Sequence, residues 1–250
     1  MSDVNDHLVL ISGESATGKS ASLQNIKNQE RWLYLNCEAG KRLPFRNKFK
    51  AFTITDPYQV YEAFDATRPG GPMHGTIDGI IIDTVTFLMD MFESQYVLNS
   101  ANSQKAWGDY AQFFKKLMQD YVASSDKAVI ILAHTRSDLD DAAMMMKTSV
   151  PIKGSLKNNG IESYFSTVVS TKKVSLKELE AYHNPMLTIS PQDEMLGYKH
   201  VFQTQLTKAT VGERIRSPMG MFDVKETYID NDAQLLLNHL SSYYGDNAAA

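Results

Sequence analysis

Short apolar runs alternate with polar or amphipathic stretches over the first half of the chain. The runs are rich in Val, Ile, Leu, Phe and Tyr, and most are bounded by Gly, Asp, Asn or Ser. This pattern is typical of strands buried on both faces of a parallel sheet. The predicted strands are 7–12, 31–36, 49–55, 79–83 and 128–134. The predicted helices are 19–27, 58–66 and 103–123, the last with aromatic residues at a helical spacing that predicts a face packed on the sheet.

The second half has a different texture. Residues 136–160 are polar without clear periodicity, which predicts a long functional or mobile loop. Strand-like residues return at 164–174 and 198–207, followed by a basic turn at 208–216. Together these elements predict an α/β fold, with a mostly parallel sheet flanked by helices and a C-terminal antiparallel hairpin extension. We expect a single domain over residues 1–250, with its core at about 7–175, the extension at about 195–230 and a frayed tail at 245–250.

Composition narrows the class of protein. The 250 residues are 43% hydrophobic and 22% charged, which is enough apolar material for one sizeable core. The single cysteine, Cys37, excludes an internal disulfide. No apolar run approaches the roughly 20 residues of a membrane helix, and the N-terminus is acidic, so we expect a soluble, cytoplasmic protein with no membrane partner. The net charge of −4 means that any nucleic-acid site must be a local patch.

One motif carries a specific chemistry. The segment Gly-Glu-Ser-Ala-Thr-Gly-Lys-Ser at 13–20 matches the phosphate-loop pattern G-x-x-x-x-G-K-[ST] and follows an apolar strand. The glycines let backbone N–H groups turn toward a phosphate, and the lysine bridges the β- and γ-phosphates. The chain is therefore predicted to bind ATP through Gly13, Glu14, Ser15, Ala16, Thr17, Gly18, Lys19, Ser20 and Ala21.

Three side chains at strand ends complete the predicted site. Asp83 ends an apolar strand and is predicted to hold Mg²⁺ together with the Ser20 hydroxyl. Glu38 follows the second strand, where a carboxylate would face the same crevice and activate a water molecule. His134 ends the fifth strand, where its polar tip would contact the γ-phosphate and report its loss to the segment that follows.

At these residues the chain resembles the RecA-type ATPase core, and more closely the short phage ATPases of that class that act as single-strand DNA annealing proteins. The resemblance covers about residues 8–223. It implies a RecA-like P-loop NTPase that hydrolyses ATP at subunit interfaces, a homo-oligomeric ring or filament, and a place in phage recombination in the host cytoplasm. It also implies a single-strand DNA-binding protein as a partner. In that family the positions of Glu38 and His134 are the catalytic glutamate and the coupling residue.

The resemblance also implies where DNA and a neighbouring subunit would bind. A cation near the C-terminal hairpin would reach the neighbour's γ-phosphate, and Lys208, Arg214 and Arg216 are the candidates. The DNA-binding loop region corresponds to about 136–160. Basic stretches at 41–50, 147–177 and 199–225 in an acidic protein favour a backbone-tracking groove for single-stranded DNA. The predicted DNA contacts are Arg136, Lys147, Lys153 and Lys157.

Three other functions fit the same motifs. A helicase-like motor would share every one of them. A small-molecule P-loop kinase would share the phosphate loop, but kinases of this kind close an arginine-rich lid, and the chain has few arginines after residue 134. A nucleotide-gated scaffold would bind ATP and hardly hydrolyse it. The order of the strands distinguishes a kinase from a RecA-type ATPase. A RecA-type core inserts a strand between the phosphate-loop strand and the strand that ends at Asp83, and a kinase core does not.

Overall fold

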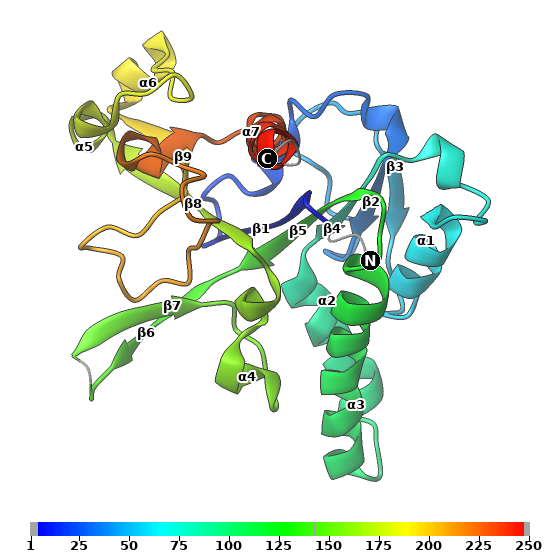
Figure 1. Cartoon of the computed structure of the whole chain (residues 1–250). Helices are drawn as coiled ribbons and strands as arrows, with labels where there is room; N and C mark the ends of the chain where they lie inside the picture. The colour runs from blue at the N-terminus through cyan, green and yellow to red at the C-terminus, as the bar shows by residue number, and fades with distance from the viewer. Residues whose placement is uncertain (1–4, 143, 248–250) are drawn as a thin grey trace.

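An eight-stranded sheet runs through the computed structural model, which describes residues 5–142 and 144–247 (Figure 1). The strands lie in the order β10-β9-β8-β1-β5-β4-β2-β3. All neighbours from β8 to β3 are parallel, whereas β9 and β10 are antiparallel to their neighbours. The strands are β1 (Leu8–Gly13), β2 (Trp32–Asn36), β3 (Lys50–Thr53), β4 (Gly79–Asp83), β5 (Ala128–His134), β8 (Thr167–Ser175), β9 (Tyr198–Gln203) and β10 (Tyr228–Asp230).

The predicted fold class is confirmed, and the order of the strands decides one alternative. The five strands predicted in the first half are β1 to β5 within a residue or two of their expected ends. Strand β5 pairs with β1 on one side and with β4 on the other, so it separates the phosphate-loop strand from the strand that ends at Asp83. This is the inserted strand of the RecA-type arrangement, and it argues against a kinase core.

Helices cover both faces of the sheet. They are α1 (Gln59–Thr67), α2 (Val85–Phe92), α3 (Ser103–Lys116), α4 (Leu156–Asn159), α5 (Leu176–Leu179), α6 (Pro191–Leu196) and α7 (Ala233–Asn247). Because side chains alternate along a strand, Leu10 packs with α1, α2 and α3, whereas its neighbours Val9 and Ile11 pack with α7 on the opposite face. Both faces of β1 are therefore buried, as its continuous apolar sequence requires.

Side-chain caps fix the starts of α2 and α3 on the first of these faces. The Thr84 hydroxyl accepts a hydrogen bond from the Phe87 N–H, and the Asn102 side chain accepts one from the Lys105 N–H. The predicted aromatic face of α3 is buried against the sheet, and a π-helical turn, Leu117–Val122, continues the helix beyond Lys116. No helix of residues 5–142 or 144–247 has the length and apolar character needed to cross a membrane.

The predicted helix at 19–27 was wrong, because only Ser20–Leu23 forms a short 3₁₀ helix. Backbone bonds here span three residues, as from the Gln24 N–H to the Ala21 carbonyl oxygen. Two side-chain contacts divert the backbone from an α-helix. In the first, the Ser22 hydroxyl donates to the Lys19 carbonyl oxygen. The Lys27 N–H then donates to the Gln234 side chain on α7. In a longer helix this N–H would have donated to the carbonyl oxygen four residues earlier.

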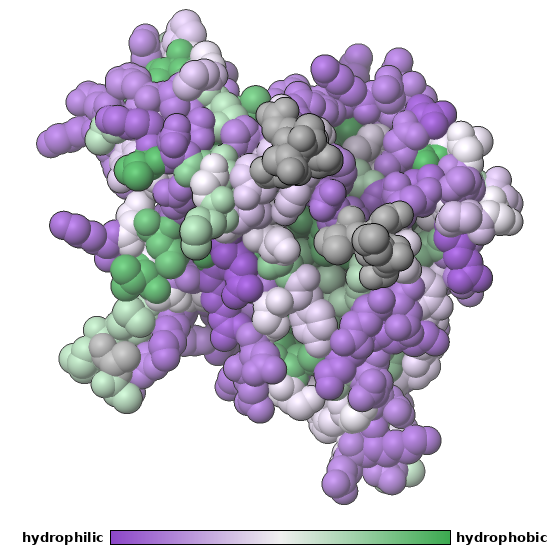
Figure 2. Space-filling model, viewed as in Figure 1, coloured by the Kyte–Doolittle hydropathy of each residue, from purple (hydrophilic) through white to green (hydrophobic). Residues whose placement is uncertain are grey.

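The predicted loop at 136–160 was also wrong, because it contains a β-hairpin. Strands β6 (Arg136–Asp140) and β7 (Met145–Ser149) pair antiparallel and project from the body of the protein (Figure 1). The tip of the hairpin exposes the apolar side chains of Leu139, Met144 and Met146. Figure 2 shows this region in pale green. The tail predicted at 245–250 is helical up to Asn247, and residues 248–250 lie outside the described part.

Candidate active site and basic groove

The phosphate loop follows β1, and two of its positions leave no room for a side chain larger than that of glycine. A Cβ on Gly13 would lie 2.1 Å from the Thr171 hydroxyl oxygen on β8. Gly18 has φ +107°, and a Cβ there would lie 2.7 Å from the Asn231 side-chain nitrogen. Both glycines of the motif are therefore required by this structure, one by close approach and one by its backbone conformation as well.

Lys19 curls back over the loop. Its Nζ donates to the carbonyl oxygens of Gly13 (2.9 Å) and Glu14 (2.7 Å), and the side chain is buried. Burial lowers the pKa of Lys19 to about 8, although the charges of Asp83 and Glu38 oppose that shift. Neutral carbonyls are weaker partners for an ammonium than phosphate oxygens are, so a bound triphosphate can take their place.

Asp83 ends β4 next to Ser20, as predicted from the two motifs. Its Oδ2 accepts from the Ser20 hydroxyl (3.0 Å) and from the Tyr34 hydroxyl (2.8 Å). The carboxylate is 2% exposed, and its Oδ1 has no hydrogen-bond partner within the described residues. Burial raises the pKa of Asp83 in spite of the hydrogen bonds from Tyr34 and Ser20.

This pair fits Mg²⁺. A buried carboxylate oxygen without a donor, beside a serine hydroxyl, offers the hard oxygen ligands that Mg²⁺ prefers, and the ion keeps its other positions for phosphate oxygens and water. Nowhere in residues 5–142 and 144–247 do three or more His, Cys, Asp or Glu side chains form a group that could hold a metal. Ser20 and Asp83 are the two side chains whose oxygens fit such an ion at the phosphate loop.

Glu38 and His134 meet at the carboxyl edge of the sheet, where the sequence placed them separately. The Glu38 Oε1 lies 3.1 Å from the His134 Nε2, and its Oε2 lies 2.7 Å from the Lys41 Nζ. Burial disfavours the charged form of Glu38, but the hydrogen bonds from Lys41 and His134 outweigh it, so the pKa of Glu38 is lowered. The His134 backbone N–H donates to the Thr86 hydroxyl (2.9 Å), which ties this strand end to α2.

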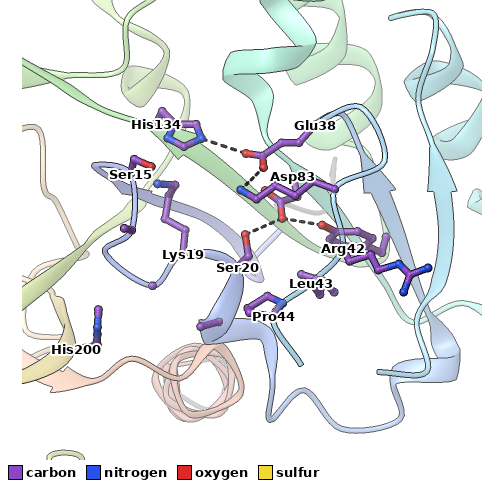
Figure 3. A pocket seen from close by; sticks show the side chains of 15 residues that line it. Ser15, Lys19, Ser20, Glu38, Arg42, Leu43, Pro44, Asp83, His134 and His200 are labelled. Atoms are coloured by element: carbon purple, nitrogen blue, oxygen red, sulfur yellow. Dashed lines mark hydrogen bonds and ion pairs between the residues drawn. The ribbon is translucent and has the colours of Figure 1, made fainter. Parts of the chain in front are cut away.

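These side chains share one cleft of about 360 Å³. Figure 3 shows Lys19, Ser20, Asp83, Glu38 and His134 converging on it, with the segment that includes Arg42, Leu43 and Pro44 on one side and His200 on the other. A carboxylate, a lysine and a histidine thus surround a space next to a preformed phosphate loop. The arrangement can bind a nucleoside triphosphate and hold a base near its terminal phosphate.

The C-terminal strands hold the phosphate loop from the far side, which the sequence did not reveal. The Thr17 hydroxyl lies 2.5 Å from the Thr171 hydroxyl on β8. The His200 Nδ1 on β9 donates to the Thr17 carbonyl oxygen (2.7 Å), and the Asn231 side chain donates to that of Gly18 (2.9 Å). Their partners lie more than 150 residues away along the chain, so no local pattern marks these residues.

The cations proposed to act on a neighbouring subunit all lie outside the cleft of their own chain. Lys208 and Arg216 are exposed, and the Arg216 backbone pairs with Val168 of β8. The Arg214 Nη1 instead contacts the buried Glu162 carboxylate (3.1 Å) and the Asn159 carbonyl oxygen (2.9 Å). In this structure Arg214 therefore ties two segments of the same chain together, while Lys208 and Arg216 keep their side chains at the surface.

Three of the four predicted DNA contacts gather in a second cleft of about 430 Å³, here called the basic groove. Arg136, Lys153 and Lys157 line it with the Trp107 ring and Arg214. Lys153 pairs with Glu93, and Arg136 pairs with Asp138 (2.9 Å), whereas Lys157 makes no ion pair with a described residue. Lys147, the fourth, lies outside this groove and pairs with Asp140 across the hairpin.

The inserted strand β5 and the nucleotide cleft at the phosphate loop define the class of protein as a P-loop NTPase. The chain belongs to the AAA domain family, which matches residues 6–212 and so includes the phosphate loop, Glu38, Asp83 and His134. Membership makes it a nucleotide-binding protein of a family whose members are generally ATPases that act with Mg²⁺. No curated protein matches the sequence. The match identifies this broad family, and the narrower class of phage annealing proteins remains a resemblance.

Proposed function

We propose that the protein is an ATP-dependent single-stranded DNA-binding ATPase that promotes annealing and recombination in phage DNA metabolism. The observation that carries this proposal is that the two sites are adjacent along the chain, where β5 ends and β6 begins. His134 ends β5 in the nucleotide cleft, and Arg136, two residues later, begins the hairpin and lines the basic groove. A change in the contacts of His134 therefore has a short covalent path to the groove.

The chemistry of the basic groove supports single-stranded nucleic acid as the ligand. Cations from β6, from the segment after β7 and from the C-terminal turn face one cleft in a protein whose net charge is −4. Phosphates of a flexible strand would contact Lys153 and Lys157, and the Trp107 ring offers an aromatic surface for a base. The charges are local, as an acidic protein that binds DNA requires.

In the proposed cycle, the phosphate loop binds ATP and Glu38 takes a proton from the attacking water. Mg²⁺ held by Ser20 and Asp83 would neutralise charge on the phosphates. His134 contacts the γ-phosphate and orders the hairpin, which raises affinity for DNA until hydrolysis releases it. Chains assemble as a ring or filament in which Lys208, Arg214 or Arg216 completes a neighbour's site, and a single-strand DNA-binding protein is a partner.

Binding of a labelled oligothymidylate, followed by fluorescence anisotropy, tests this proposal. We expect tighter binding with a non-hydrolysable ATP analogue than with ADP, and a steep loss of affinity as salt rises. Equal affinity with both nucleotides would contradict the coupling of the two sites. Annealing of complementary strands and unwinding of a forked duplex then separate the annealing function from the helicase-like alternative, because only a motor opens the fork.

A further inference from the structure

Glu162 is a buried carboxylate that the proposed cycle does not use. Its side chain is 2% exposed, and both of its oxygens are engaged. The Oε1 accepts a hydrogen bond from the Val150 N–H (2.7 Å), and the Oε2 accepts one from the Arg214 Nη1 (3.1 Å). Both partners line the basic groove. A buried charge is stable only when it is paired and hydrogen-bonded, so Glu162 fixes the position of the arginine beside it.

The backbone around Arg214 is shaped to receive its guanidinium. The Nη1 also donates to the carbonyl oxygen of Asn159, the last residue of α4 (2.9 Å). Gly160 has φ +71°, and a Cβ there would overlap the Arg214 Nη1 and crowd the Glu162 Oε2. Only glycine at this position therefore leaves room for the ion pair.

The turn that carries Arg214 is also fixed on both sides of this residue. The Gly212 carbonyl oxygen accepts a hydrogen bond from the Thr148 N–H on β7 (3.0 Å). Arg216 and Val168 on β8 exchange two backbone hydrogen bonds (2.8 and 3.1 Å). The backbone of Arg214 and the Nη1 end of its guanidinium are thus held in place before any ligand binds.

The rest of the guanidinium is available to a ligand. The Nε and Nη2 of Arg214 make no hydrogen bond with a residue in the described part of the chain, and the side chain is 35% exposed where it lines the groove. Arginine presents its N–H groups in a rigid fork that matches the oxygens of a phosphate. A fork that is fixed in advance loses little side-chain entropy on binding.

We propose that Arg214 is a preorganised phosphate contact of the basic groove and that Glu162 is the positioning residue that holds it there. This inference rests on the DNA binding proposed above and assigns a fixed contact to the phosphate backbone of the single strand. Arg214 then acts on a ligand of its own chain, which leaves Lys208 and Arg216 as the candidates for a neighbour's nucleotide.

Substitutions at Arg214 test the assignment by fluorescence anisotropy with labelled oligothymidylate. Arg214→Gln removes the fork. Arg214→Lys keeps the charge and the pair with Glu162, but a single nitrogen replaces the three of the fork. Arg68→Gln is the matched control, because Arg68 pairs with Asp65 (3.0 Å) outside the groove. Thermal unfolding checks that each variant is folded at the temperature of the titration.

For Arg214→Gln we expect the affinity for oligothymidylate to fall about tenfold, as for a lost hydrogen bond to a charged group. Arg214→Lys should lose several-fold although its charge remains. Arg68→Gln should bind as the wild type does. Wild-type affinity in Arg214→Lys would show that a charge suffices and would overturn the preorganised fork. Loss of DNA-independent ATP turnover with DNA affinity retained would assign Arg214 to a neighbour's nucleotide and would also overturn it.

Glu162→Gln separates positioning from the effect of charge. Its amide oxygen can still accept from the Val150 N–H, whereas the anionic partner of Arg214 is lost. Removal of a negative charge beside the groove would by itself strengthen DNA binding. We expect binding to weaken several-fold instead, with no further loss when Glu162→Gln is added to Arg214→Gln, because Glu162 acts through Arg214. Unchanged or tighter binding would contradict the positioning role.

Failure of the proposed function has a different signature in the same titrations. Equal affinity of the wild type with the ATP analogue and with ADP contradicts the coupled cycle, yet the loss in Arg214→Gln stays measurable. Wild-type affinity in both Arg214 variants, with coupling intact, overturns this inference alone. A wild type that does not bind oligothymidylate overturns both.

Discussion

The nucleotide cleft and the basic groove hold charged side chains in opposite ways. In the cleft, Asp83 is 2% exposed and Lys19 is 6% exposed, and each bonds to groups of the loop and neighbouring strands. In the groove, Arg136, Lys153 and Lys157 are exposed, and Arg136 and Lys153 pair with nearby acids. Buried charges interact strongly and tolerate no loss, whereas exposed ones act additively and are screened by salt. We therefore expect single substitutions to cause large losses of function in the cleft and to weaken function by small steps in the groove.

The strongest test of this contrast is Glu38→Gln, an isosteric change at the proposed base. Removing a general base typically costs about 10²- to 10⁴-fold in rate, so we expect kcat to fall by that amount with ATP binding retained. Steady-state turnover and nucleotide titration measure the two effects. Glu30→Gln, at an exposed acid before β2, is the matched control. Unchanged turnover in Glu38→Gln would favour the nucleotide-gated scaffold.

Lys19→Ala comes next. Loss of a charge-assisted contact to phosphate corresponds to about 10- to 150-fold in affinity, so we expect the dissociation constant for ATP to rise by that factor. Calorimetric titration measures it. Lys27→Ala serves as the control, because this exposed lysine follows the loop outside the cleft. Equal affinity in both variants would show that the phosphate loop does not bind the nucleotide.

The buried lysine also predicts a pH dependence. Because the pKa of Lys19 is about 8 in the nucleotide-free protein, the side chain loses its proton above that pH, and binding a phosphate then requires proton uptake. ATP affinity should be constant below pH 8 and fall by at most about tenfold per pH unit above it. Lys19→Arg stays charged and should lose this limb. A limb that persists in Lys19→Arg would assign it to another group.

The smallest effects are expected in the groove. Lys153→Gln and Lys157→Gln should each weaken oligothymidylate binding by a few-fold and lower the slope of log affinity against log salt by about 1. Their combination should be additive. Anisotropy titrations between about 50 and 200 mM salt measure this, with Lys105→Gln on the exposed side of α3 as the control. A total loss of binding from one substitution would break the contrast between the two regions.

The sequence predicts the cleft well because each of its main groups stands in a local pattern. The phosphate loop is a contiguous motif, and Asp83 and His134 end apolar strands that parallel pairing brings to one edge. The strand bounds follow from the same runs, because strands buried on both faces must be apolar at every position. Glu38 follows β2 and reaches this edge for the same reason.

Other contacts depend on parts of the chain that no local pattern joins. Thr171, His200 and Asn231 reach the phosphate loop from the C-terminal strands, and Tyr34 reaches Asp83 from a position that reads as core. The hairpin β6–β7 escaped prediction because a strand pair exposed on its faces has no apolar alternation to mark it. The helix expected at 19–27 was lost to a local bond from the Ser22 hydroxyl to the Lys19 carbonyl oxygen and to a bond from the Lys27 N–H to Gln234 on α7. Only the second of these is a tertiary override of local propensity.

ATP turnover with and without oligothymidylate, measured at two salt concentrations, tests whether nucleotide hydrolysis and DNA binding are coupled through β5. Lys19→Ala provides the blank. We expect single-stranded DNA to raise the turnover of the wild type, higher salt to remove the increase, and the blank to show neither effect. Turnover indifferent to DNA at both salt concentrations would contradict the coupling and reduce the basic groove to solvated surface.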